Sequence, residues 1–235
     1  MGLLADAWMG AARLRRRSRR KSNQRFRDER TRWVRDLAPG RSFADIGCLW
    51  NVHGEIALLA EEAGASRVTA FDAMDPTPEF EQARTRRGSS IRFVQGDLHD
   101  PSSIQEIGEH DIVWCTGVIY HSPDPFGLVR HLRAITGQKL RLGSHVIPEV
   151  PGIPQASVFY PGLDERGRAP HRRAHRDGYM AISTPFDPTP GMQYANYWWG
   201  LTPSALGGML DAAGFAVERM EQPHPFYVDV IARPR

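Results

Sequence analysis

The sequence predicts an α/β protein with a doubly wound, Rossmann-like sheet of seven mostly parallel strands, the last of which runs antiparallel. Two observations predict this fold. Short apolar runs alternate with helical patterns from residue 42 to residue 143, a spacing that is typical of βαβ units. Two further strand-like runs lie close together near the end of the sequence, and their spacing allows a hairpin.

Each element up to residue 143 can be placed in order. The predicted strands are 42–47, 67–72, 91–95, 111–115 and 139–143. The predicted helices between them are 54–64, 77–87, 101–107 and 125–135. Each strand is a short apolar run, as expected for a parallel sheet that helices cover on both faces.

The alternation stops between residues 148 and 200. This segment contains eight prolines and shows no clear period, but it is rich in tyrosine, tryptophan and phenylalanine. Loops of this length inside a compact domain are usually functional. We therefore expect a substrate cap, inserted between the fifth strand and the last helix.

Regular structure returns at Thr202 and Pro203, which are favourable residues for the start of a helix. This helix should end at Gly214. The last two strands are predicted at about 215–221 and 226–232. Pro223 and Pro225 separate them, and a hairpin at this point would make the last strand enter the sheet antiparallel.

The size and composition of the chain suit one large domain or one domain with an insertion. Of its 235 residues 41% are hydrophobic, and no apolar run approaches the roughly 20 residues that span a bilayer. The two cysteines, Cys48 and Cys115, are too few for a disulfide framework, a zinc site or an iron–sulfur site. We therefore expect a cytoplasmic protein with no membrane partner and no metal.

Positive charge is concentrated near the N-terminus. Residues 11–35 hold 12 of the 30 lysines and arginines but only two acidic residues, whereas the rest of the chain holds 18 basic and 25 acidic residues. We interpret this segment as a solvated helix, because a basic run alone is weak evidence for nucleic-acid binding. Its buried stripe would consist of Phe26, Trp33, Val34 and Leu37.

The segment D-I-G-C-L-W-N-V-H-G at residues 45–54 opens like a nucleotide-binding loop, because a strand breaks into Gly47. The second and third glycines of G-x-G-x-x-G are absent. A dinucleotide needs those glycines to wrap its pyrophosphate tightly against a helix N-terminus. Their absence therefore argues against NAD as the ligand.

Five segments, in this order, resemble the class I S-adenosylmethionine (SAM)-dependent methyltransferases. They are D-I-G-C at 45–48, F-D-A at 71–73, G-D-L at 96–98, H-D-I-V-W-C-T-G-V-I-Y-H-S-P-D-P at 110–125 and W-G-L-T-P-S-A-L-G-G-M-L-D-A-A-G-F at 199–215. The longer, glycine-poor loop departs from the family pattern. The resemblance implies an enzyme that binds SAM and releases S-adenosylhomocysteine (SAH).

This interpretation divides the chain into four segments. They are a basic N-terminal helical arm at 1–37, a SAM-binding core at 38–147, the aromatic and proline-rich cap at 148–200, and a C-terminal helix and strand pair at 201–235 that completes the core. The resemblance covers the core and most of the last segment, but neither the arm nor the cap.

Acidic residues at successive strand ends supply the predicted cofactor site, since ligands bind at the carboxyl edge of such sheets. Asp45 would attract the sulfonium and ammonium of SAM, Asp72 would accept the two ribose hydroxyls, and Asp97 would accept from the adenine amino group. The full set of predicted cofactor residues is Asp45, Gly47, Cys48, Asp72, Ala73, Asp97, Leu98 and Cys115. The cysteines are interpreted as small lining residues, because the sequence offers no obvious base for either.

Tyr120 and His121 follow the fourth strand, beside the expected position of the methyl group, and are the predicted catalytic residues. His121 could act as a general base, although the resemblance also allows it a role in packing. The predicted substrate-binding residues are His145, Tyr160, Tyr194 and Trp198. His171 and His175 are four residues apart but crowded by arginines, so we interpret them as a surface pair rather than metal ligands.

We expect a methyltransferase that acts on a small-molecule acceptor in specialised (natural-product) metabolism. Two alternatives stay open. A tRNA-modifying enzyme of the wobble-uridine type is one, because Tyr120-His121 and the W-G-L-T-P segment at 199–203 resemble such transferases and the arm could hold phosphate. A non-catalytic SAM-fold partner subunit is the other. The sequence predicts neither the methylated atom nor the oligomeric state.

Overall fold

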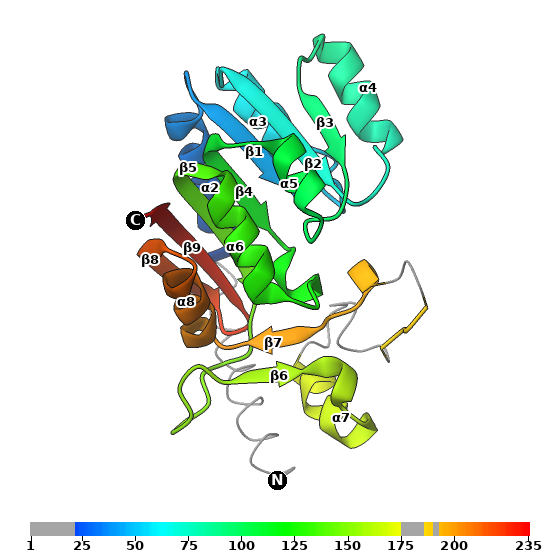
Figure 1. Cartoon of the computed structure of the whole chain (residues 1–235), viewed down its shortest axis with the longest axis vertical. Helices are drawn as coiled ribbons and strands as arrows, with labels where there is room; N and C mark the ends of the chain where they lie inside the picture. The colour runs from blue at the N-terminus through cyan, green and yellow to red at the C-terminus, as the bar shows by residue number, and fades with distance from the viewer. Residues whose placement is uncertain (1–21, 175–185, 190–192) are drawn as a thin grey trace.

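Seven strands form the central sheet of the protein (Figure 1). They are β1 (Ser42–Ile46), β2 (Arg67–Asp72), β3 (Arg92–Gln95), β4 (His110–Thr116), β5 (Thr136–His145), β8 (Phe215–His224) and β9 (Tyr227–Pro234). Their order across the sheet is β3-β2-β1-β4-β5-β9-β8. Neighbours from β3 to β5 run parallel, whereas β9 is antiparallel to both β5 and β8. The predicted sheet, with its antiparallel last strand, is confirmed.

The computed structural model describes residues 22–174, 186–189 and 193–235 of the chain. The α-helices that accompany the sheet are α2 (Ser22–Leu37), α3 (Glu55–Glu62), α4 (Pro78–Arg87), α5 (Pro101–Ile107), α6 (Pro125–Ile135) and α8 (Pro203–Ala212). Helices α2, α3 and α4 share one buried cluster with the sheet, and α5, α6 and α8 share another. The sheet is therefore covered on both faces. Within the described ranges, no helix has both the length and the apolar character needed to cross a membrane.

Four helices begin with the same local chemistry. In each, a side-chain oxygen accepts a hydrogen bond from a backbone N–H of the first turn, and a proline follows. The capping residues are Thr77, Asp100, Asp124 and Thr202. The cap satisfies an N–H that has no partner inside the helix, and proline lacks the N–H where none is needed. Three of these helices follow β2, β3 and β4, so their starts fix the loops at the carboxyl edge of the sheet.

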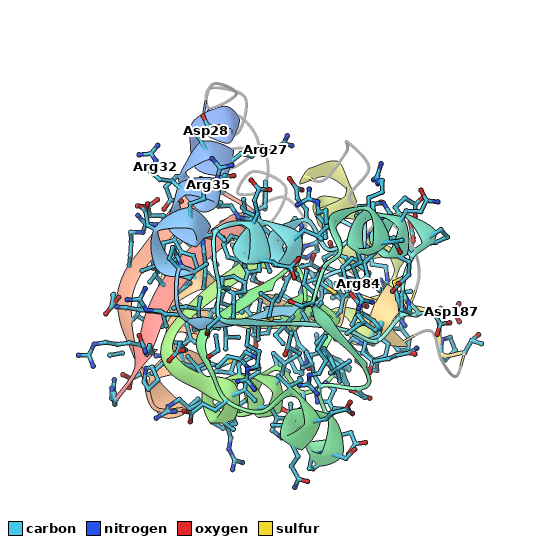
Figure 2. All side chains as sticks on the ribbon, turned by 90° about the horizontal axis from the view of Figure 1, so that it is seen from above. Arg27, Asp28, Arg32, Arg35, Arg84 and Asp187 are labelled. Atoms are coloured by element: carbon cyan, nitrogen blue, oxygen red, sulfur yellow. The ribbon has the colours of Figure 1, made fainter. Side chains whose placement is uncertain are left out.

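Helix α2 packs against the sheet through an apolar stripe. Val34 is fully buried, and Trp33 and Leu37 pack against the same cluster. The charged side chains that Figure 2 labels on this helix are exposed. The predicted stripe is confirmed for these three apolar residues, whereas the side chain of Phe26 and the whole of residues 1–21 lie outside the described part.

Helix α2 is also attached to the sheet by charge. Arg141, fully buried in β5, donates to Glu29 of the helix at 2.6 Å and makes two bonds to Asp229 of β9, at 3.2 and 2.7 Å. Glu29 also pairs with Arg219 of β8. A buried guanidinium is tolerated when carboxylates pair with it and satisfy its donors. The network therefore fixes α2 against β5, β8 and β9.

The cap contains more regular structure than the sequence predicts. Strands β6 (Ser157–Phe159) and β7 (Trp199–Leu201) pair antiparallel as a second, two-stranded sheet. Between them lie η2 (Tyr160–Gly162), α7 (Glu165–Ala174) and η3 (Gln193–Ala195). Both β7 and η3 contact η1 (Ile119–His121), the short helix that follows β4. The cap thus covers one end of the central sheet (Figure 1).

Candidate functional site

The loop between β1 and α3 uses a series of turns in place of the missing glycines. Gly47 is left-handed (φ 76°), and a Cβ there would lie 2.3 Å from Val118 Cγ2, so this position requires glycine. Asn51 and His53 also have positive φ, 56° and 44°, which is unusual for residues other than glycine. Gly54, at φ 73°, then opens α3. These left-handed residues turn the backbone between β1 and α3.

Asp72, at the end of β2, holds this loop in place. Its Oδ2 accepts the N–H of Leu49 at 2.8 Å, and its Oδ1 accepts the N–H of Met74 at 3.0 Å. Burial raises the pKa of the carboxyl, against the lowering effect of these hydrogen bonds. Each carboxylate oxygen can accept more than one hydrogen bond, so the geometry is compatible with the predicted ribose contact. The neighbouring Ala73 accepts a 3.4 Å bond from the Gln95 side chain through its carbonyl.

Asp45 is buried beneath the loop. Its Oδ2 accepts the N–H of Ala57, in the first turn of α3, at 3.0 Å. Burial raises the pKa of Asp45 to about 7, although this hydrogen bond opposes the shift. Asp45 therefore fixes the start of α3, and its contact with the charged end of a cofactor stays a prediction. Cys48 and Cys115 are also buried, which raises the pKa of both thiols and leaves them protonated at neutral pH.

Asp97, which follows β3, lies where the core meets the cap. Its Oδ1 accepts the N–H of His99 at 2.8 Å, and the hydroxyl of Tyr194, from the cap, also hydrogen-bonds to it. Burial and the Asp97 carboxylate raise the pKa of Tyr194, so its hydroxyl stays protonated and donates. Leu98 is buried, and its carbonyl lies 2.6 Å from Nδ1 of His131. Tyr194, predicted to bind substrate, thus reaches the predicted adenine site.

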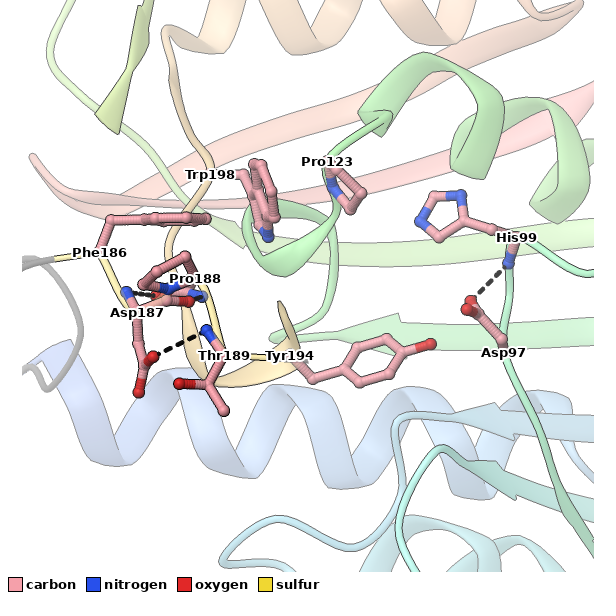
Figure 3. A pocket seen from close by; sticks show the side chains of 10 residues that line it. Asp97, His99, Pro123, Phe186, Asp187, Pro188, Thr189, Tyr194 and Trp198 are labelled. Atoms are coloured by element: carbon pink, nitrogen blue, oxygen red, sulfur yellow. Dashed lines mark hydrogen bonds between the residues drawn. The ribbon is translucent and has the colours of Figure 1, made fainter. Parts of the chain in front are cut away.

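A cavity of about 460 Å³ is lined by residues of this part of the core and of the cap (Figure 3). Asp97 and His99 line its core side, and Phe186, Tyr194 and Trp198 supply an aromatic wall. Figure 3 shows the Tyr194 hydroxyl directed towards Asp97 and His99. A flat, largely apolar group such as an adenine ring or an aromatic acceptor suits such walls.

His121, in η1, is held in one tautomer. Its Nδ1 lies 2.8 Å from the backbone carbonyl of Asn196 in the cap. A carbonyl only accepts hydrogen bonds, so we assign the proton to Nδ1 and the lone pair to Nε2. Burial lowers the pKa of His121, which favours the neutral ring at pH 7. A neutral imidazole with a basic nitrogen is the state that general-base catalysis requires.

Tyr120 belongs to a buried aromatic cluster beside this histidine. Its ring stacks on Tyr197 of the cap at a centroid distance of 4.5 Å and meets His145 edge-on at 4.9 Å. Tyr160 packs into the same cluster. The predicted substrate residues are therefore divided between two places. His145 and Tyr160 belong to this cluster, whereas Tyr194 and Trp198 line the cavity.

One interpretation of the sequence is wrong. His171 is not on the surface: it is buried, and its ring packs edge-on against Tyr160 at 5.2 Å. Its proposed surface partner, His175, lies outside the described residues. In the part of the chain that the structure describes, no group of three or more His, Cys, Asp or Glu side chains could hold a metal ion.

Asn196 and Tyr197 are two site residues that sequence reasoning missed. The side chain of Asn196 accepts from the backbone N–H of Asp187 at 2.9 Å and donates to its carbonyl at 2.8 Å. These bonds fix the segment whose carbonyl orients His121. Tyr197 stacks on Tyr120. Both lie in an aromatic-rich run, but composition alone cannot distinguish the members that face the core.

Two sequence comparisons each match less than half of the chain. Residues 44–138 match a family model described as a methyltransferase domain. The ubiquinone biosynthesis O-methyltransferase of Vibrio parahaemolyticus serotype O3:K6 (strain RIMD 2210633) is 27% identical over 108 residues, which cover 46% of this chain and 42% of that protein. The match therefore spans less than half of the length of this curated relative.

Two solved structures share the fold. The N-terminal domain of EvdMO1 with SAH bound aligns with a TM-score of 0.59 and 15% identity over 88% of this chain and 79% of that chain. The magnesium protoporphyrin IX methyltransferase ChlM from Synechocystis PCC 6803, also with bound SAH, gives a TM-score of 0.57 and 16% identity over 92% and 85%. At these identities the likeness concerns the fold.

Proposed function

The chain carries a methyltransferase domain of the class I SAM-dependent family, and on this premise we propose that it transfers a methyl group from SAM to a small-molecule acceptor and releases SAH. One observation carries the proposal. Three polar groups lie at the carboxyl ends of three strands at one edge of the sheet: Asp72 is the last residue of β2, Asp97 follows β3 and His121 follows β4. The bound SAH in both structural relatives supports the choice of cofactor.

The residues at this edge have distinct proposed roles towards SAM. Asp72 would accept the ribose hydroxyls, and Asp97 would accept from the adenine amino group, with Tyr194 of the cap closing over that end. When bound, SAM supplies a methyl group on a sulfonium that is already a good leaving group. The protein must then add alignment, exclusion of water and, for an O–H or N–H acceptor, a base.

His121 is the proposed base. Its Nε2 would take the proton of the acceptor as the acceptor oxygen or nitrogen attacks the methyl group. The imidazolium that forms keeps its Nδ1–H bond to the Asn196 carbonyl, which also becomes stronger once the donor is charged. The buried rings of Tyr120 and Tyr197 would exclude water from this position.

The cap supports a planar, apolar acceptor. Phe186 and Trp198 give the cavity flat aromatic walls, which stack well on flat ligands. Two of the relatives are named for ubiquinone biosynthesis and for magnesium protoporphyrin IX, and these two names also favour an aromatic acceptor. We place the reaction in specialised metabolism, as the sequence predicts.

An acceptor panel with radiolabelled SAM tests this function. The panel should contain phenols, catechols, aromatic carboxylates, aromatic amines and bulk tRNA. We expect label in at least one small aromatic acceptor and none in tRNA. Label in tRNA alone would favour the tRNA-modifying alternative. Tight SAH binding without label in any acceptor would favour the non-catalytic partner subunit.

With an acceptor in hand, His121→Ala tests the base. Turnover should fall by about 10²-fold or more while SAH affinity stays within a few-fold, because only the proton transfer is lost. Burial lowers the pKa of His121, so the wild-type rate should stay level as the pH falls through about 6.5, the ordinary histidine pKa, and drop only at lower pH. A loss below fivefold would give His121 a packing role.

A further inference from the structure

Four aromatic rings of the cap form a row that starts in the cavity and continues onto the surface. Phe186 and Trp198 line the cavity and meet edge-on at a centroid distance of 4.8 Å (Figure 3). The ring of Trp198 lies 6.4 Å from that of Phe159, which in turn lies 4.9 Å from the ring of Trp199. Phe159 is 44% exposed and does not line the cavity. These four rings, called the aromatic row below, therefore extend the cavity wall across the surface of the cap.

Hydrogen bonds fix the two tryptophans of the aromatic row. The backbone N–H of Trp198 donates to the carbonyl of Tyr120 at 2.9 Å. Nε1 of Trp199 donates to the carbonyl of Pro123 at 3.0 Å, and Pro123 also lines the cavity. Phe159 and Trp199 are register partners on β6 and β7, so their side chains share one face of this small sheet. A surface that is fixed in advance binds a ligand at a smaller cost in entropy.

The two segments that carry the outer part of the aromatic row contain no charged residue. No aspartate, glutamate, lysine or arginine occurs in residues 150–163 or 193–210, although 24% of the whole chain is charged. Segments without cations offer no counter-charge to a nucleic-acid backbone. Single exposed aromatic residues are ordinary on a protein surface, but Phe159 is joined to the wall of a cavity. The position and the lack of charge both suit an uncharged, apolar ligand.

We propose that the acceptor is longer than one ring. Its methylated ring would lie in the cavity against Trp198, and an uncharged, apolar arm would extend along the aromatic row over Phe159. A single-ring acceptor in the cavity would leave Phe159 exposed, whereas an arm that covers this ring removes apolar surface from water. Stacking of a flat arm on the ring adds to that gain. This inference rests on the proposed function, since it defines the class of acceptor for the same site.

Calorimetry on the SAH-saturated protein with matched phenols tests the arm. The probes are phenol, 4-phenylphenol, which adds a second ring, and 4′-hydroxybiphenyl-4-carboxylate, which adds a charge to that ring. The wild-type protein should bind 4-phenylphenol about tenfold or more tightly than phenol, and the carboxylate should lose most of this gain. Phe159→Ala should reduce the gain to less than about threefold. Val217→Ala, at an exposed apolar position of the edge strand β8, is the control and should keep the whole gain.

The outcomes separate the inference from the proposed function. The arm would be overturned if the second ring brought no gain in the wild-type protein, if the charged ring bound equally well, or if Phe159→Ala kept the gain. In each of these cases SAH binding would still uphold the cofactor. A wild-type protein that does not bind SAH would overturn the proposed function as well.

The SAH affinity of the Phe159 variant is measured in the same experiment. A loss of SAH affinity equal to the loss of the gain would also overturn the arm, because the effect would then come from the cap as a whole. If circular dichroism shows that Phe159→Ala does not fold, Phe159→Leu takes its place. Leucine keeps the apolar bulk but not the flat ring, so about half of the gain, on a logarithmic scale, should be lost.

Discussion

At the residue scale, the carboxylate of Asp72 holds a loop in place and is also proposed to bind the ribose of the cofactor. Its oxygens accept the N–H groups of Leu49 and Met74, and this holds a loop that lacks the second and third glycines of G-x-G-x-x-G. We propose that the same oxygens also accept the ribose hydroxyls of the cofactor. On this proposal, a glycine-poor loop would still frame a nucleoside, because a strand-end carboxylate supplies the restraint that glycine turns do not.

Asp72→Ala should weaken SAH binding at least tenfold. Two charge-assisted hydrogen bonds to the ribose would be lost, each worth roughly 1.5–3 kcal/mol. Calorimetry gives the dissociation constant, and circular dichroism shows whether the fold is kept. Asp75→Ala, exposed three residues further on, is the control. An unchanged dissociation constant for Asp72→Ala would remove the ribose assignment.

Strand-end acids can be found from sequence, but the hydrogen bond from Arg30 of α2 to Thr116 of β4 could not. Asp72 and Asp97 each follow a short apolar run, so their positions at one edge of a parallel sheet follow from the pattern. Arg30 is one of 12 basic residues between positions 11 and 35, and the pattern of that segment favours a solvated helix. Only the packing of α2 shows which of them turns towards the sheet.

At the scale of elements, the sequence predicts where the core helices begin but does not predict the strands of the cap. Thr77-Pro78, Asp100-Pro101 and Asp124-Pro125 carry the start signal within a few residues, so helices α4, α5 and α6 begin where predicted. Strands β6 and β7 have three residues each and pair across about forty intervening residues. No local pattern indicates such a pair. The pair depends on tertiary contacts, and β7 also contacts η1.

The hydroxyl of Tyr194 in the cap donates a hydrogen bond to Asp97, at the proposed adenine site. The substitution Tyr194→Phe would remove this hydrogen bond. We expect SAH binding to weaken about three- to tenfold, because Asp97 loses a hydrogen bond that orients its carboxylate. Calorimetry measures the change. Phe159→Leu, at an exposed aromatic position of the cap, should leave the affinity within about twofold. Equal losses in both variants would point to general loosening of the cap.

Charge divides the whole molecule into two unequal parts. Outside residues 11–35 the chain holds 18 basic and 25 acidic residues, so the folded body is acidic although the pI is 9.1. The described part of the basic segment, helix α2, packs on the sheet. The other seven basic residues of the segment lie at positions 13–21, outside the described part. An acidic body repels a polyanion such as tRNA, which leaves the basic segment as the place for it to bind.

Deletion of residues 1–21 tests whether this charge serves RNA. We expect nearly unchanged turnover of a small-molecule acceptor and no loss of a specific RNA complex. Filter binding of tRNA to the intact and shortened proteins at several salt concentrations measures this. If the segment neutralised phosphates, the logarithm of the affinity would fall with the logarithm of salt concentration, by about 0.7–0.9 per phosphate contacted.

Steep salt dependence alone would not show that RNA is the substrate, because any cluster of arginines binds polyanions weakly at low salt. The small-molecule function would be contradicted by submicromolar tRNA binding near physiological salt that disappears on deletion, together with methyl incorporation into the RNA. Weak binding that salt abolishes, with turnover of the small acceptor intact in the shortened protein, would instead leave catalysis to the described core. That result is the one we expect, because every residue proposed for the site lies between Asp45 and Trp199.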